Sequence, residues 1–192
     1  MNKEIEICVK CYDSLEELNK KLKLNKFVVK EDFILKDIYM SNELKEIKNK
    51  NYPNLLSDYL LIRETVGKRK TIVHKCKKYD GNGGIINQKN SKCGILDIKN
   101  AYDLLLSIGY REFLRLEDHN ILVSNNKNEL YIQVLSSGDI YIEMESRQIY
   151  SPIKNGENIQ ELINSLKQYN FNIGDFFFEN KAINTLKTDE KL

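Results

Sequence analysis

The sequence predicts an α+β protein in which antiparallel strands dominate and a few helices are set apart from them. Two observations support this prediction. Runs in which apolar and polar residues alternate, the period of a pleated strand, recur along most of the chain. Three other segments, near the start, in the middle and toward the end, space their apolar residues three or four apart, as amphipathic helices do.

The first strand is expected at residues 3–10, where Ile5, Ile7 and Val9 alternate with polar residues. A helix should follow, because Ser14 and Glu17 have the spacing of a capping box. Residues 27–39 are rich in Val, Ile and Phe and predict a long strand, or two strands with a bend. The polar segment 41–56, which contains Pro53, is interpreted as a loop with or without one helical turn.

Residues 58–64 and 70–77 predict a β-hairpin with Gly67 in its turn. The glycine-rich stretch 80–84 is interpreted as a surface turn, because no helix and no Lys-Ser/Thr pair follow it as in a phosphate-binding loop. Asp97 should cap a helix that ends at Gly109.

The second half predicts strand after strand, then a last amphipathic helix and a charged tail that frays. The strands are expected at 112–117, 119–123, 130–134 and 139–145, and the helix at 159–166. Residues 1–192 are therefore expected to form a single domain, since no segment has the composition of a linker.

Composition limits the functions that the chain can have. A hydrophobic fraction of 41% with 30% charged residues is typical of a globular protein, and a net charge of +2 gives no indication of nucleic-acid binding. No run of about 20 apolar residues predicts a membrane helix, and residues 3–10 do not resemble a signal peptide, so a cytoplasmic protein is expected. Cys8 and Cys11 have redox or zinc spacing, but without a second pair the thiols are expected to be reduced.

Two strands far apart in the sequence carry acidic faces. Glu4 and Glu6 share one face of the first strand, with Lys10 further along it, and Glu143 and Glu145 share a face with Tyr141. Each set taken alone fits a solvated strand face. Together, and with Arg63 and Lys75 near the ends of intervening strands, they suggest a closed sheet with a charged interior.

The order and spacing of these motifs resemble the CYTH superfamily, the triphosphate tunnel metalloenzymes that include class IV adenylyl cyclases and thiamine- and tripolyphosphatases. The resemblance extends over residues 4–145 and more loosely over the C-terminal helix. The matching residues are Glu4 and Glu6 of the opening Glu-x-Glu-x-Lys signature, Asp37 and Tyr39, Arg63, Lys75, Gly109 and Tyr110, and Gly138, Tyr141, Glu143 and Glu145.

The resemblance implies a closed antiparallel β-barrel, a tunnel with helices packed outside. It implies that Glu4, Glu6, Glu143 and Glu145 bind Mg²⁺ or Mn²⁺, and that Arg63 and Lys75 bind phosphate; Lys10 is added to the phosphate ligands on strand geometry alone. The implied ligand is a nucleoside triphosphate, thiamine triphosphate or polyphosphate, which the protein would hydrolyse or cyclise. No catalytic residue is assigned, and a homodimer is left open.

Several positions depart from the family pattern. Cys8 replaces the lysine of the opening signature, Leu61 replaces an arginine, and Gln133 replaces an aspartate. The expected Lys-x-Arg falls within residues 117–120, which contain no permanent cation, although Arg115 lies nearby. Two hypotheses remain open: a divergent phosphohydrolase or cyclase, and a CYTH-like domain that binds a nucleotide or polyphosphate without turnover. His74 is expected on the outside, since it lies on the strand face opposite Lys75.

Overall fold

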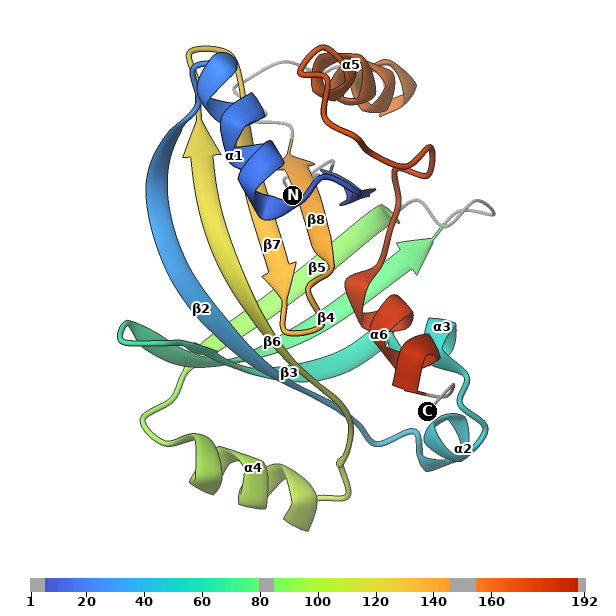
Figure 1. Ribbon diagram of the computed structural model, residues 1–192. Coiled ribbons are helices and arrows are strands. Elements are labelled where there is room, and N and C mark those ends of the chain that lie inside the picture. The colour runs from blue at the N-terminus through green and yellow to red at the C-terminus, as the bar shows by residue number, and fades with distance from the viewer. Residues whose placement is uncertain (1–5, 80–84, 146–154, 190–192) are drawn as a thin grey trace. The chain divides into compact units, whose positions relative to one another are not determined.

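The computed structural model describes residues 6–79, 85–145 and 155–189 (Figure 1). Eight strands form one antiparallel sheet in the order β1-β8-β7-β6-β2-β3-β4-β5. They are β1 (Glu6–Cys11), β2 (Val28–Ser41), β3 (Asp58–Thr65), β4 (Arg69–Tyr79), β5 (Ile85–Gly94), β6 (Arg111–Ser124), β7 (Glu129–Leu135) and β8 (Ile140–Glu145). The helices are α1 (Leu15–Leu24), α2 (Leu44–Lys48), α3 (Tyr52–Leu55), α4 (Ile98–Ser107), α5 (Asn155–Lys167) and α6 (Lys181–Asp189).

The chain divides into two compact units, and β2 and β6 contribute to both. Unit 1 comprises Met1–Phe33 and His119–Asn180, and unit 2 comprises Ile34–Asp118 and Lys181–Leu192. Among the described residues, unit 1 has one hydrophobic cluster and unit 2 has two.

Unit 1 packs α1 and α5 against one face of its strands. The alternation in β1 buries Ile7 and Val9 on this face, where they join Ile142 of β8, Leu18 of α1 and Leu166 of α5, all fully buried. Burying each such side chain contributes about 1.5–3 kcal/mol, so this cluster fixes which face of β1 and β8 points inward to the helices. The polar residues of both strands are consequently held on the opposite face.

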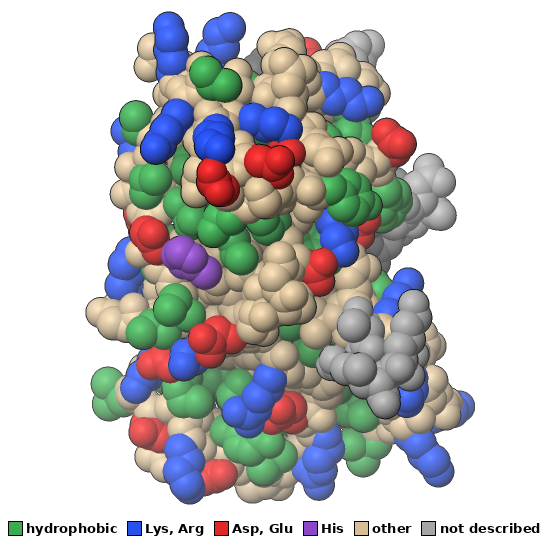
Figure 2. All heavy atoms as spheres, in the orientation of Figure 1, with side chains coloured by type: hydrophobic (Ala, Val, Ile, Leu, Met, Phe, Trp, Pro, Cys, Tyr) green, Lys and Arg blue, Asp and Glu red, His purple; other side chains and the backbone are tan. Residues whose placement is uncertain are grey.

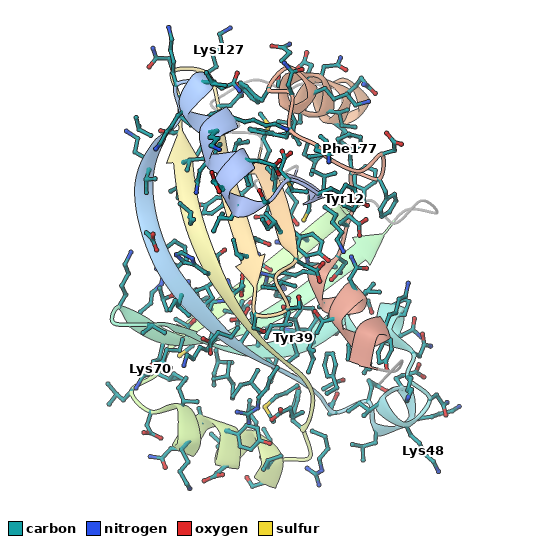
Figure 3. The ribbon with its side chains drawn as sticks, viewed as in Figure 1. Tyr12, Tyr39, Lys48, Lys70, Lys127 and Phe177 are labelled. Carbon is teal, nitrogen blue, oxygen red and sulfur yellow. The ribbon has the colours of Figure 1, made fainter. Side chains whose placement is uncertain are left out.

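The second edge of β1 is paired with the segment that follows α5. The backbone N–H of Cys8 donates to the carbonyl of Phe177 (3.0 Å), and the N–H of Glu179 donates to the carbonyl of Cys8 (2.9 Å). Gly174 donates in the same way to Lys10 (3.0 Å). Figure 3 labels Phe177 in this segment. The chain therefore satisfies this edge of β1 itself, and the expected barrel is confirmed only as far as its antiparallel sheet.

Unit 2 covers both faces of its strands with helices. On one face, Ile38 of β2 and Ile62 of β3 pack against Ala101 and Leu105 of α4. On the other face, an apolar cluster contacts α6, and Figure 3 labels Tyr39 within it. The members of this cluster include Tyr39, Tyr59, Leu61, Val73, Leu114, Leu116, Ala182 and Leu186.

Local sequence signals correctly give the starts of α1 and α4 and the hairpin turn at Gly67. The Ser14 hydroxyl accepts from the N–H of Glu17 while the Glu17 carboxylate accepts from the N–H of Ser14, which completes the predicted capping box. Asp97 caps α4 as predicted. Gly67 at the predicted hairpin turn and Gly109 at the predicted helix end adopt φ angles of 72° and 99°, a backbone region that other residues rarely adopt.

Several expectations need correction. The two strands expected at 112–117 and 119–123 are one continuous strand, β6, because its alternation of buried and exposed residues runs through Asp118. The expected loop 41–56 contains α2 and α3, and the expected tail contains α6. The polar strand β5 was not predicted. Glu4 and the glycine-rich stretch 80–84 lie outside the described residues.

The surface carries charges of both signs. Figure 2 shows Lys and Arg side chains interleaved with Asp and Glu side chains over the visible face, in keeping with the net charge of +2. In the part of the chain that the structure describes, no helix is long and apolar enough to cross a membrane.

Candidate functional site

Three carboxylates converge on the polar face of unit 1. The antiparallel register of β1 and β8 places Glu6 opposite Glu145 and Cys8 opposite Glu143. One carboxylate oxygen from each of Glu6, Glu143 and Glu145 lies within 4.8 Å of the others. We call these three residues the acidic cluster. Carboxylates this close repel one another, and their oxygens are the ligands that Mg²⁺ and Mn²⁺ prefer. The donor set therefore fits a hard divalent cation.

Strand β7 supports the acidic cluster from the side. The amide Nε2 of Gln133 donates to Oε2 of Glu143 (3.1 Å), and Gln133 is buried. Gln133 thus holds one oxygen of Glu143 in place, at the position where the family pattern has an aspartate. Tyr131 lies opposite Glu143.

The electrostatic field around Tyr131 is negative. Burial is the main cause that raises the pKa of the Tyr131 phenol, and the negative charges of nearby glutamates raise it further. Those glutamates are Glu145, Glu129, Glu143 and Glu31. The acidic cluster therefore belongs to a larger group of carboxylates, and the sequence alone did not identify Glu31 and Glu129 as part of it.

A pocket of about 390 Å³ adjoins this group of carboxylates. Its lining combines the turn between β6 and β7 with residues of β8 and α5, including Asn125, Asn128, Glu129, Glu145 and Glu161. These oxygen- and amide-bearing side chains fit a polar ligand or a hydrated cation better than an apolar one.

Lys10 shares the polar face of β1 but has a partner of its own. Its register places it opposite Tyr141, and its Nζ lies 2.7 Å from Oδ1 of Asp139. The hydrogen bond to Asp139 raises the pKa of Lys10, although burial opposes the shift. The ammonium expected to compensate for Cys8 is therefore neutralised at the end of the strand.

Arg63 in unit 2 forms a bidentate ion pair with a buried carboxylate. Its Nε lies 2.8 Å from Oδ1 of Asp37 and its Nη2 lies 2.6 Å from Oδ2. The Asp37 side chain is 0% exposed and that of Arg63 is 27% exposed. Burial lowers the pKa of Arg63, but the hydrogen bonds and charge of Asp37 outweigh burial and raise it. Asp37 and Arg63 both matched the family pattern, and the structure adds that they bind each other.

Two further cations share a strand face with Arg63. The register places Arg63 opposite Thr71 and Lys92 of β5 opposite Val73, while Arg69 lies opposite Thr65. Burial lowers the pKa of Lys92, and the positive charges of Arg69 and Arg63 lower it further. Cations that repel one another in this way attract an anion.

Lys75 occupies the same face, between Tyr59 and Asn90, and is half-buried. We call the four cations Arg63, Arg69, Lys75 and Lys92 the cationic face. Sequence reasoning found only Arg63 and Lys75. It did not single out Arg69, and it missed Lys92 because residues 85–94 lack apolar alternation. Pairing a return strand with the predicted strand 70–77 could have revealed Lys92.

Between these four cations, the same strand face carries apolar residues that contact α6. Leu61, at the position of a family arginine, is fully buried and lies opposite Val73. Tyr39 and Tyr59 stack with their ring centroids 5.4 Å apart. Both belong to the cluster that includes Ala182 and Leu186 of α6. An arginine at position 61 would put a charge into this apolar cluster, so the packing of α6 accounts for the leucine.

Helix α6 also supplies a cation to β6. Nζ of Lys181 lies 2.5 Å from Oδ2 of Asp118, whose side chain is 0% exposed. The segment 117–120, where the family pattern has Lys-x-Arg, thus has a buried aspartate with a lysine partner from another element. Arg115, which was considered for this role, instead pairs with Glu112 (2.6 Å) and lies over the ring of Tyr102.

Comparison with known structures identifies the fold. The PH1819 protein of Pyrococcus horikoshii superposes with a TM-score of 0.72 at 17% identity, covering 99% of this chain and 100% of that one. HpAC1 from Hippeastrum, a proposed adenylyl cyclase with a dominant triphosphatase activity, gives 0.66 at 11% identity, covering 99% and 97%. A proposed adenylate cyclase of Vibrio parahaemolyticus gives 0.65 at 12% identity, covering 96% and 97%.

The chain has a CYTH-like fold. At these levels of identity the likeness concerns the fold alone. No family model matches the chain, and no curated protein matches it. The resemblance inferred from Glu-x-Glu, Arg63 and the final acidic strand is thereby confirmed for the fold of the chain.

Proposed function

We propose that this CYTH-like protein binds a triphosphate compound together with Mg²⁺ or Mn²⁺ and catalyses metal-assisted attack at phosphorus, as a phosphohydrolase or a cyclase. The observation that supports the proposal best is the acidic cluster, in which Glu6, Glu143 and Glu145 offer oxygens within 4.8 Å of one another. The proposal includes the closed, tunnel-like barrel that the sequence predicts, with Glu4 as a fourth metal ligand.

Each group of residues has a defined task in this proposal. Glu6, Glu143 and Glu145 bind the cation, and Gln133 orients Glu143 through its amide hydrogen bond. A divalent cation supplies charge neutralisation and polarises the phosphoryl oxygens. Arg69, Lys75 and Lys92 attract the phosphate groups, and Arg63 reaches them only from the part of its guanidinium that Asp37 does not bind. Lys10, predicted to bind phosphate, is the weakest member of the set because Asp139 neutralises it.

The direct test is a substrate panel. ATP, thiamine triphosphate and tripolyphosphate are incubated with the protein and Mg²⁺ or Mn²⁺, and the products are separated into phosphate, diphosphate and cyclic nucleotide. We expect turnover of at least one compound, reduced at least tenfold in Glu145→Gln and unchanged in Glu16→Gln, an exposed glutamate of α1. Turnover no faster than the metal-only background for all three compounds would contradict an enzyme.

Binding without turnover is the second candidate, and the Arg63–Asp37 pair favours it. A guanidinium held by a buried carboxylate stabilises the sheet, but it has fewer N–H groups left to donate to a transferring phosphoryl group. In this case tripolyphosphate should raise the melting temperature without being consumed. The stabilisation should fall in Lys92→Gln and persist in Lys89→Gln, since these two lysines lie on opposite faces of the same strand. Equal loss in both variants would count against the cationic face.

A linkage measurement tests whether the carboxylates and the cations serve one ligand. If they do, Mn²⁺ and tripolyphosphate must each tighten the binding of the other by the same factor. Calorimetric titration of each ligand in the absence and presence of the other measures both factors. Independent binding of the two ligands would contradict a shared metal–triphosphate complex.

A further inference from the structure

A second group of side chains of metal-ligating types lies in unit 2, on the face of β3 and β4 opposite the cationic face. Asp58, at the start of β3, lies directly opposite Cys76 of β4, and His74 lies two residues before Cys76 on the same face. Nε2 of His74 lies 2.6 Å from Oδ1 of Asp58, and Sγ of Cys76 lies 3.5 Å from Oδ2 of Asp58. One ligand atom from each residue lies within 4.8 Å of the other two.

Solvent reaches this group while the backbone beneath it is held in place. The side chains of His74 and Asp58 are 47% and 62% exposed, and Cys76 is half-buried. Further along the same face, Leu60 and Ile72 pack against the α4 cluster, which fixes this end of the hairpin. The three side chains thus project from two hydrogen-bonded strands rather than from a loop, an arrangement that preorganises ligands.

The three atoms have the chemistry and spacing of a zinc site. In a tetrahedral Zn²⁺ centre with bonds of about 2.0–2.3 Å, neighbouring ligand atoms lie about 3.3–3.6 Å apart. The Cys76 Sγ lies 3.5 Å from Oδ2 of Asp58 and the His74 Nε2 lies 2.6 Å from the other oxygen, Oδ1, so binding through a single Asp58 oxygen requires the carboxylate to rotate, a side-chain movement. A thiolate, an imidazole and a carboxylate suit Zn²⁺ or Co²⁺, whereas the all-oxygen acidic cluster suits Mg²⁺ or Mn²⁺.

We propose that Asp58, His74 and Cys76 bind a zinc-class divalent cation through one oxygen, one nitrogen and one sulfur, with water as the fourth ligand. The site is separate from the proposed triphosphate function, because it uses the opposite strand face and a different class of metal. Bound metal would join β3 to β4 beyond the hairpin hydrogen bonds and would stabilise the folded protein according to its free concentration.

The positive charge of Lys89 leads to a second prediction about this site. Lys89 of β5 lies directly opposite Cys76, and its ammonium opposes the approach of a cation. Replacing Lys89 with glutamine should therefore tighten metal binding, although Lys89 is not a ligand. A structural Asp58–His74 ion pair without metal affinity would show no such effect.

Cobalt titration of the full-length, reduced and chelator-treated protein tests the proposal. We expect one equivalent of Co²⁺ to produce the near-ultraviolet charge-transfer absorption of a cobalt–thiolate bond, and Zn²⁺ to abolish it by displacement. Cys76→Ser should remove the band, and His74→Gln and Asp58→Asn should weaken Co²⁺ binding more than about tenfold. The matched control is Cys93→Ser, an exposed cysteine on β5 outside the group, which should keep the band.

Two results would overturn the proposal. One is the absence of the charge-transfer band in the wild-type protein. The other is a band that persists in Cys76→Ser, which would assign the thiolate to a different cysteine. Far-ultraviolet circular dichroism of each variant confirms folding, and because Asp58 and His74 are exposed, their variants remain informative if Cys76→Ser folds poorly.

Discussion

The acidic cluster of unit 1 and the cationic face of unit 2 accommodate their charges in opposite ways. In unit 1, Glu6, Glu143 and Glu145 gather within 4.8 Å, and other glutamates add to the same negative field. In unit 2, Arg63 is bound by the fully buried Asp37, and the middle of the face is apolar and contacts α6. Packing and the Arg63–Asp37 ion pair thus explain much of the second arrangement, and the first concentrates like charge, as a cation site does.

This difference predicts opposite signs for charge removal in the two units. Deleting a charge from a buried ion pair leaves its partner uncompensated, which destabilises the fold. Deleting one of several clustered carboxylates removes repulsion, which leaves stability unchanged or raises it. Lys181→Ala and Glu145→Gln test the two sides of this contrast directly.

The largest effect is expected for Lys181→Ala in α6. It leaves the buried carboxylate of Asp118 without its lysine, so the free energy of unfolding should fall by about 3–5 kcal/mol. Urea denaturation monitored by circular dichroism measures the change. Lys187→Ala, an exposed lysine of the same helix, is the control and should cost less than about 0.5 kcal/mol. Equal losses in the two variants would show that the ion pair does not anchor α6.

Gln133→Glu should have the next largest effect. It removes the amide that donates to Glu143 and adds a negative charge at a buried position, so metal-free stability should fall by about 1–3 kcal/mol. Mn²⁺ affinity should rise about tenfold, because the cluster gains a carboxylate that the metal can neutralise. Calorimetric titration measures the affinity, with Gln160→Glu on the exposed face of α5 as the control. A loss of stability without a gain in Mn²⁺ affinity would argue that unit 1 holds no metal.

The acidic cluster could be predicted from the sequence because the alternation of residues within single strands determines which side chains share a face. Alternation places Glu143 and Glu145 on one strand face, and burial of Ile7 and Val9 fixes the face of Glu6. The CYTH-like architecture followed from the order of such motifs. By contrast, alternation carries no information on register, so it could not pair Asp37 with Arg63 across 26 residues.

The sequence analysis missed β5 and α6, and both elements form because of tertiary contacts and not because of a local sequence pattern. From residue 87 to residue 92, strand β5 is polar on both faces and is defined by its pairing with β4, so Lys92 could not be placed from local pattern. Helix α6 buries little more than Ala182 and Leu186, a short apolar face within a charged segment. Its role became visible only through Lys181 and the apolar cluster around Leu61.

Glu145→Gln should have a smaller effect on stability, and one of opposite sign to that of Lys181→Ala. Removing one of three clustered charges should leave the metal-free protein as stable as the wild type, or more stable by about 0.2–1 kcal/mol. Thermal and urea unfolding in the presence of a chelator measure this, and Glu16→Gln serves as the neutral control. A clear loss of stability would mean that Glu145 is held by structural contacts, and the contrast between the two units would then disappear.

The smallest effect is the pH dependence of the Lys10–Asp139 pair. The hydrogen bond from Lys10 lowers the pKa of Asp139 below its ordinary value of 3.8, although burial opposes the shift. Because the folded-state pKa is the lower one, the pair stabilises the protein above about pH 4 and loses this contribution as the pH falls through the folded-state pKa. The Asp139 side chain is 37% exposed and solvent screens the pair, so the contribution should be less than about 1 kcal/mol. Unfolding of the wild type and Asp139→Asn should therefore differ at pH 7 and converge as the pH falls through the folded-state pKa of Asp139. A difference that does not shrink at all as the pH is lowered from 7 into the acid range would show that Asp139 acts through something other than its charge.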